Sequence, residues 1–169
     1  TGNAQMFYDL YKGMIKYNTD DCVFMIYNSG NGTWERDSKE SIRAKIYADL
    51  MIEIMHQNST HLPEDYNSRD YNANIKHLSS SSGKEAMLKE VKHIGEIPCE
   101  NNDFDKDNLL LNTLDGVVNL ATGELLEHSP AFMMSRNTYS HYNQIDTPTR
   151  WVKFIDETTC GNTELAIYL

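Results

Sequence analysis

The chain has 169 residues and a mass of 19.4 kDa, and its 15 Lys and Arg against 25 Asp and Glu leave a formal net charge of −10. The shares of 40% hydrophobic and 24% charged residues are typical of a folded domain and exclude a disordered tail. The densest apolar stretch, residues 23–27, is far too short to span a membrane. The acidic balance argues against broad nonspecific binding to nucleic acid. Three widely spaced cysteines, Cys22, Cys99 and Cys160, predict reduced thiols in the cytoplasm.

The first forty residues predict a helix followed by a small antiparallel meander. Apolar side chains recur at helical spacing from Ala4 to Tyr11, and Gly13 follows as a stop. We expect strands at residues 14–17, 22–27 and 33–36, with a turn at 28–32.

The strongest helical pattern follows, over residues 38–56. Asp37 and Glu40 form a capping pair at its start. The expected apolar face repeats every four residues and consists of Ile42, Ile46, Leu50 and Ile54.

Two more helices are expected before the second half of the chain. Residues 71–78 have a short helical pattern. Ser82 and Glu85 form a capping box for the next helix, which Gly95 and Pro98 end. Its expected apolar face consists of Met87, Leu88, Val91 and Ile94.

Residues 109–126 switch to strand character. Turn sequences at 115–116 and 121–124 divide them into a second three-stranded antiparallel unit. Thr147 is expected to cap a later helix with Pro148 at its first position and Trp151 on its packed apolar face, and Asn162 to cap another. The pattern predicts an α+β fold with about five or six helices. We expect one domain, 1–169, as a fragment of a larger protein, with sub-lobes 1–98 and 99–169 as the alternative organisation.

Several partial motifs fail to define a catalytic or metal site. Asp103, Asp105 and Asp107 match the start of a calcium loop, but Asn108 and Leu114 stand where the loop needs glycine and glutamate. The six histidines lack zinc spacing, and no nucleophile motif is present. The sequence therefore predicts a solvated acidic loop, with no catalytic residue, metal or cofactor.

Two groups of basic residues are candidate nucleic-acid contacts. Residues 69–94 carry net charge +2, from five bases and three acids, and the bases are Arg69, Lys76, Lys84, Lys89 and Lys92. The second group combines bases with aromatic rings that could stack on nucleotide bases, and it consists of Arg136, Arg150 and Lys153 around Tyr139, Tyr142 and Trp151. The competing interpretation is that such lysines line the solvated faces of helices, and that Trp151 packs inside.

Residues 115–125 read DGVVNLATGEL, and His128-Ser129-Pro130 follows. This stretch resembles the signature of the domain that immediately precedes the superfamily-3 helicase module in phage, plasmid and poxvirus primase-helicases. The resemblance extends to the spacing of Pro148, Trp151 and Phe154. Its signature positions are Asp115, Gly116, Asn119, Thr122, Gly123, His128, Pro130 and Trp151. Asp115 replaces the usual Asn and Asn119 the usual Asp, and both exchanges suit turns.

The resemblance implies a parent protein with a primase module upstream and a hexameric helicase downstream, the latter using ATP and Mg. This chain contains neither set of catalytic motifs. We therefore expect a non-catalytic connecting or collar domain in phage or mobile-element DNA replication, whose partners are the adjoining helicase and primase modules. A module that guides single-stranded DNA is the alternative. A metal-dependent nuclease using Asp103, Asp105 and Asp107 is a third.

Overall fold

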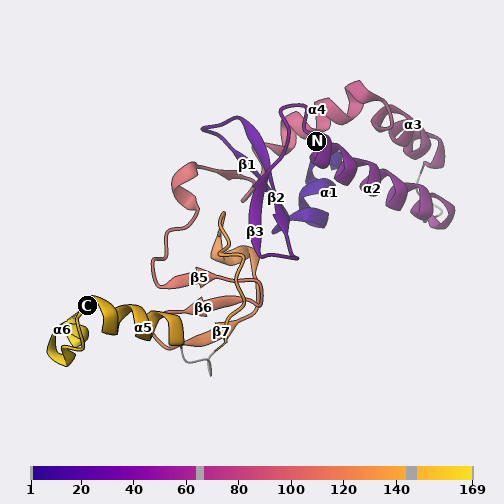
Figure 1. The fold of residues 1–169 in the computed structure, drawn as a ribbon. Coiled ribbons are helices and arrows are strands. Elements are labelled where there is room, and N and C mark those ends of the chain that lie inside the picture. Colours follow the sequence, from indigo (N-terminus) through magenta and orange to yellow (C-terminus); the bar gives the residue numbers. More distant parts are fainter. Residues whose placement is uncertain (1, 64–66, 144–147, 169) are drawn as a thin grey trace.

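The computed structural model describes residues 2–63, 67–143 and 148–168. Within them the chain forms six α-helices and two small, mostly antiparallel sheets, so the predicted α+β class is confirmed. Figure 1 shows an elongated arrangement, with four helices at one end, the larger sheet in the middle and the smaller sheet followed by two helices at the other. No helix among these residues is long and apolar enough to cross a bilayer.

The larger sheet has the strand order β3-β2-β1-β4. β1 (Ile15–Asn18), β2 (Val23–Asn28) and β3 (Thr33–Arg36) form the predicted antiparallel meander, each within one residue of its expected limits. β4 (Pro98–Cys99) pairs in parallel with β1 and was not predicted. A two-residue strand has no periodicity to detect, and its position depends on the backbone bond from Tyr17 N to Ile97 O, 2.6 Å.

Four helices form a group on one side of this sheet: α1 (Gly2–Tyr11), α2 (Ile42–Asn58), α3 (Ser68–Leu78) and α4 (Ser81–Val91). α3 packs on α2 and α4 and lies farthest from the strands. Short 3-10 turns, η1 (Ser59–His61) and η2 (Asn101–Asp103), follow α2 and β4. The main core lies between these helices and the sheet. Its largest fully buried members include Phe7, Ile15, Phe24, Ile26, Met51 and Met55.

The expected apolar face of α2 is wrong. Ile42, Ile46 and Leu50 are 56, 53 and 52% exposed. The buried face lies on the other side of the helix and consists of Ala44, Ala48, Met51, Ile52 and Met55. Two alanines with no exposed surface let α2 approach its neighbours closely, so the helix packs through small side chains.

Both predicted caps differ from the observed ones. Asp37 does cap α2, but its carboxylate accepts from Arg43 N at 3.0 Å and Ala44 N at 2.9 Å rather than acting with Glu40. The helix begins at Ile42, later than expected, because the preceding residue has a left-handed φ of 56°. At α4 the cap is Ser80, whose hydroxyl accepts from Gly83 N, and not Ser82.

The smaller sheet has the predicted order of three antiparallel strands, β5 (Leu110–Asn112), β6 (Val117–Asn119) and β7 (Glu124–Leu126). After it come a 3-10 turn, η3 (Pro130–Phe132), and two helices, α5 (Thr149–Thr158) and α6 (Thr163–Tyr168). Asn162 accepts from Leu165 N as the expected cap of α6.

The beginning of α5 and its packing differ from expectation. Pro148 is the N-cap of α5 rather than its first residue, and Thr147 lies outside the described residues. The expected packing of Trp151 is wrong, because its side chain is 58% exposed. Within α5, from Thr149 to Thr158, no residue is buried.

Replacing Asp37 with alanine should destabilise the domain by about 2 kcal/mol, because two helix N–H groups next to the core lose their acceptor. Urea unfolding measures this change. Glu40→Ala, at the exposed partner of the predicted pair, is the control and should change stability by less than about 0.5 kcal/mol. Equal losses in the two variants would contradict the capping role.

The three free cysteines should differ in reactivity. Burial raises the pKa of the Cys99 thiol to about 11, whereas Cys22 and Cys160 are exposed. Because the thiolate is the reactive species, Cys22 and Cys160 should react quickly with Ellman's reagent at about pH 8, and Cys99 should react only on unfolding. Cys99→Ser should remove the slow phase alone. A single phase for all three thiols would show that β4 does not bury Cys99.

Candidate functional site

The turn between β2 and β3 is held by side chains from the second half of the chain. The amide of Asn112 donates to Asn31 O at 3.1 Å and to Gly32 O at 3.3 Å. The amide of Asn137 donates to Asn31 O and to Thr113 O, both at 2.8 Å. Asn112 is only 4% exposed, so these bonds satisfy turn carbonyls away from water.

His128 of the family signature closes over the same turn. Its Nε2 lies 2.9 Å from Thr113 O, and its ring occupies the space beside Gly32. A Cβ on Gly32 would lie 2.3 Å from the His128 ring, and the φ of Gly32 is +69°. Only glycine fits this position without strain.

Trp34 connects the larger sheet to the segment that contains Pro130. Its indole Nε1 donates to Pro130 O at 3.0 Å, and its backbone N donates to Met134 O at 2.7 Å. Trp34 belongs to a second apolar cluster, which lies on the sheet face opposite the main core. Its buried members are Met25, Tyr27, Trp34 and Cys99, and Phe104 and Met133 pack against them. The larger sheet is therefore covered on both faces.

The first turn of the signature depends on Asp115 and Gly116. The Asp115 carboxylate is bonded to His141 Nδ1 at 2.8 Å and accepts from Tyr142 N at 2.9 Å, and these bonds lower its pKa. Gly116 has a φ of +151°, and a Cβ there would lie 2.3 Å from Leu126 O. This turn thus anchors the segment that leaves the smaller sheet.

The second turn uses Asn119, Thr122 and Gly123. The side-chain Oδ1 of Asn119 accepts from Ala121 N at 2.9 Å, and the backbone carbonyl of Asn119 accepts from Gly123 N at 2.7 Å. Thr122 Oγ1 accepts from Glu124 N, and Tyr142 Oη donates to Gly123 O at 2.9 Å. An amide oxygen serves this turn as well as a carboxylate would, which explains how Asn119 replaces the usual Asp.

The three aspartates of the acidic segment point to different partners. Asp103 accepts from Glu100 N and pairs with Lys106, and these contacts lower its pKa. Asp105 accepts from Ser135 N, and Asp107 from Leu109 N. Among the described residues no group of three His, Cys, Asp or Glu side chains is placed to hold a metal.

The predicted basic group of residues 69–94 does not form one surface. Arg69 and Lys76 belong to α3, and the ammonium of Lys84 is paired with Asp49 of α2 at 2.8 Å. Lys89 and Lys92 instead line a hollow of ≈ 360 Å³ between α4 and the start of α2. The other two lysines that line it are Lys39 and Lys45. We call this hollow, with its four lysines, the basic hollow.

Sequence reasoning missed Lys39 and Lys45. Both lie more than forty positions before Lys89, Lys39 just before α2 and Lys45 in its first turn. Only the packing of α2 against α4 brings the two pairs together. Lysine near a helix terminus has no pattern of its own that identifies a binding site, so no local signal was present.

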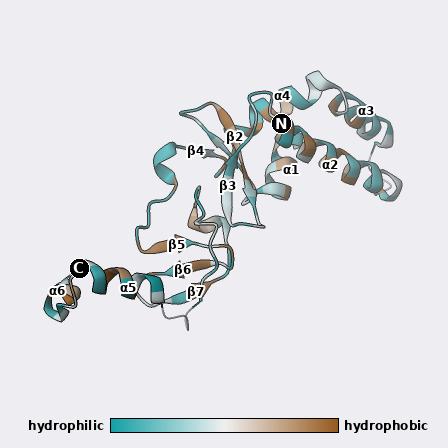
Figure 2. Cartoon of the chain, viewed as in Figure 1, coloured by the Kyte–Doolittle hydropathy of each residue, from teal (hydrophilic) through white to brown (hydrophobic). Residues whose placement is uncertain are grey.

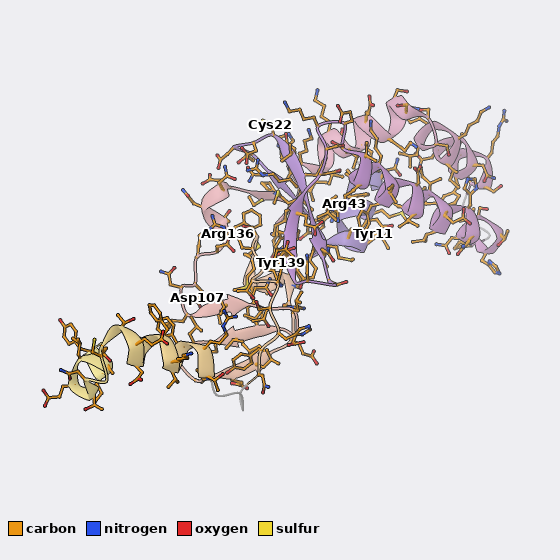
Figure 3. The ribbon with its side chains drawn as sticks, viewed as in Figure 1. Tyr11, Cys22, Arg43, Asp107, Arg136 and Tyr139 are labelled. Carbon is orange, nitrogen blue, oxygen red and sulfur yellow. The ribbon has the colours of Figure 1, made fainter. Side chains whose placement is uncertain are left out.

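The second predicted basic group is also dispersed. Arg136 lies 4.0 Å from Asp105, whereas Arg150 and Lys153 are on α5, where Lys153 faces Glu157 at 3.7 Å. Figure 3 shows Arg136 and Tyr139 between the two sheets and away from α5. The Tyr142 hydroxyl is already bonded within the second turn. The structure therefore does not bring these bases and rings together.

A family model described as "D5 N terminal like" matches residues 4–160, which is most of the chain. The chain belongs to this family. No curated protein matches it significantly.

D5 N-terminal-like domains occur in phage, plasmid and poxvirus primase-helicases, so the resemblance seen in the sequence is confirmed. In this D5 N-terminal-like chain the signature residues from Asp115 to Pro130 shape two turns and attach them to the larger sheet. These hydrogen bonds all lie within the domain and stabilise its shape.

Replacing Gly32 with alanine should destabilise this D5 N-terminal-like domain by about 2–3 kcal/mol, from the collision with His128 and the positive φ. In a His128→Ala background the collision disappears, so the further loss should fall to about 1 kcal/mol. Denaturant unfolding of the four proteins of this cycle measures the coupling.

Gly30→Ala is the matched control in the same turn, because its Cβ would meet only the Asn28 side chain and its φ is not positive. Additive losses for Gly32→Ala and His128→Ala would contradict a direct contact between turn and ring.

Proposed function

We propose that this domain is a non-catalytic connecting or collar module of a phage or mobile-element replicative primase-helicase. It supports assembly of the helicase ring and couples the primase to the helicase. The observation that supports this role most directly is a difference between two groups of residues. The signature side chains between Asp115 and Pro130 are engaged in internal contacts, whereas apolar side chains toward the C-terminal end, including the signature residue Trp151, stay exposed.

The first open face belongs to α5. Trp151, Val152 and Phe154 are 58, 54 and 52% exposed, and the Trp151 and Phe154 rings stack with centroids 5.5 Å apart. Figure 2 shows this helix as alternating hydrophobic and hydrophilic stretches. An amphipathic helix with an uncovered aromatic face is typical of a protein-binding element.

The second open face belongs to the smaller sheet. Leu111, Val118 and Leu125 are cross-strand neighbours and therefore project from the same side. Leu111 and Leu125 are 41 and 42% exposed, and Leu109 and Leu120 beside them are 55 and 53% exposed. Val118 between them is only 2% exposed, so the exposed apolar surface belongs to the four leucines around it. Exposed leucines of this kind favour a protein partner over nucleic acid, in keeping with the net charge of −10.

The partners proposed for these faces are the helicase and primase modules of the same protein. The resemblance implies that the helicase module follows this domain, and α5 lies toward that end. ATP and Mg are proposed for the helicase module, and a homo-hexamer in the host-cell cytoplasm for the parent protein.

A module that guides single-stranded DNA is the second candidate function. The basic hollow favours it, because four lysines and two glutamates leave a local charge of +2 on an acidic chain. The two roles use different surfaces, so one does not exclude the other.

In the primase-helicase that carries this domain, Trp151→Ser with Phe154→Ser should weaken ring assembly at least about tenfold, because exposed aromatic anchors dominate such interfaces. Analytical ultracentrifugation over a concentration series measures this effect. The isolated domain should keep its unfolding midpoint, since both rings are already exposed.

Lys153→Ser with Glu157→Ser changes the opposite face of α5 and is the control. Its ring assembly should match that of the unchanged protein. The proposal fails if deleting residues 4–160 leaves both ring assembly and unwinding intact.

A further inference from the structure

The basic hollow lies where three elements meet. Lys39 lies just before α2 and Lys45 in its first turn, Lys89 and Lys92 lie at the end of α4, and Phe24 of β2 forms part of the wall. α4 packs against α2, and Figure 1 shows both helices on the same side of the larger sheet. Positive side chains from separate parts of the sequence thus converge on one hollow with a volume of ≈ 360 Å³.

One lysine of the hollow is held in place by aromatic rings. The ammonium of Lys92 lies 4.3 Å from the ring centroid of Tyr17 and 5.6 Å from that of Phe24. It also donates to Tyr17 Oη at 3.3 Å. These contacts orient the charge without neutralising it, because an aromatic ring carries no net charge.

The acids of the hollow leave part of its charge uncompensated. Glu85 is paired with Lys45 at 2.9 Å, and Glu40 is the other acid that lines the hollow. In the described part of the chain, no ion pair joins an acid to Lys39, Lys89 or Lys92. Three ammonium groups therefore remain available to an anion.

We propose that the basic hollow binds a phosphate group, supplied by a nucleic-acid backbone or by a free nucleotide. Lysine ammonium groups are compact charges with three donors each, which suits the several oxygens of a phosphate. The available volume lies at the lower end of the range for small-ligand sites, so it accommodates one phosphate with its sugar rather than a folded nucleic acid.

Binding in the hollow should be independent of base sequence. Phe24 is 1% exposed, and Lys92 covers its ring and that of Tyr17, so no free aromatic face remains there for a base to stack on. Contacts to phosphate alone position a strand and do not read its sequence. Lys84 takes no part, since it does not line the hollow and is paired with Asp49.

The test compares two double variants with the same loss of charge. Lys39→Ala with Lys89→Ala removes two unpaired, exposed lysines from the hollow, and Lys76→Ala with Lys153→Ala removes two exposed lysines from α3 and α5. Fluorescence anisotropy with labelled oligo-dT of about 20 nucleotides measures affinity. Titrations at about 50 and about 200 mM salt measure the salt dependence.

The hollow variant should bind oligo-dT about tenfold more weakly at the lower salt, and the slope of log K against log salt should decrease by about 1.4. The control variant should bind as the unchanged chain does. Both variants should keep the unfolding midpoint, which separates lost binding from lost folding.

Competition with unlabelled ATP without Mg, and with unlabelled oligo-dT, distinguishes the source of the phosphate. Displacement by ATP at concentrations similar to those of oligo-dT nucleotides indicates a nucleotide site. Displacement by the oligomer alone indicates a backbone site. Either result supports the hollow as a phosphate site if the hollow variant loses it.

Two outcomes overturn the proposal. One is that the unchanged chain binds neither oligo-dT nor ATP at the lower salt. The other is that the hollow and control variants lose affinity equally, which would indicate a general charge effect. Neither outcome bears on ring assembly, so the collar function stands or fails separately.

Discussion

The arrangement of the whole chain depends on the insertion of one hairpin turn into a polar socket. Asn112 and Asn137 donate their side-chain amides to the carbonyls of Asn31 and Gly32. Each lost bond would leave a polar group without a partner in a place that water reaches poorly, which is costly. Because Trp34 follows the turn directly and bonds to Pro130 O, the same contact sets the position of the second apolar cluster.

This socket gives the family signature a physical meaning. Asp115 and Gly116 shape one turn and Asn119 to Gly123 the other, so that the smaller sheet presents Asn112 at its edge and His128 above the inserted turn. The glycines are needed where backbone or a ring comes within contact distance, as at Gly32 and Gly116. The signature residues from Asp115 to Pro130 therefore maintain the shape of the two turns and their contact with the larger sheet.

Those outer surfaces differ in character at the two ends of the molecule. The helical end carries the basic hollow, formed where α4 packs on α2, whereas the other end carries the apolar faces of α5 and the smaller sheet. The exposed Ile42, Ile46 and Leu50 on α2 add a further apolar stripe, which points away from the main core.

The sequence by itself determined the local elements. Turn residues and alternating apolar residues predicted both antiparallel units, and the signature at residues 115–130 predicted the family, because these features depend on neighbours within a few positions. Periodicity could not show which face of α2 packs. The bulky residues Ile42, Ile46 and Leu50 repeat every four positions, but the face that packs carries Ala44 and Ala48, because small side chains let α2 lie close to its neighbours in the core.

Only the tertiary structure decided the long-range features. The pairing of β4 with β1, the socket around Asn31 and Gly32, and the meeting of Lys39 and Lys45 with Lys89 and Lys92 each join segments about fifty to one hundred positions apart. Such contacts arise when packed elements bring distant side chains together, and no short stretch of sequence contains both partners.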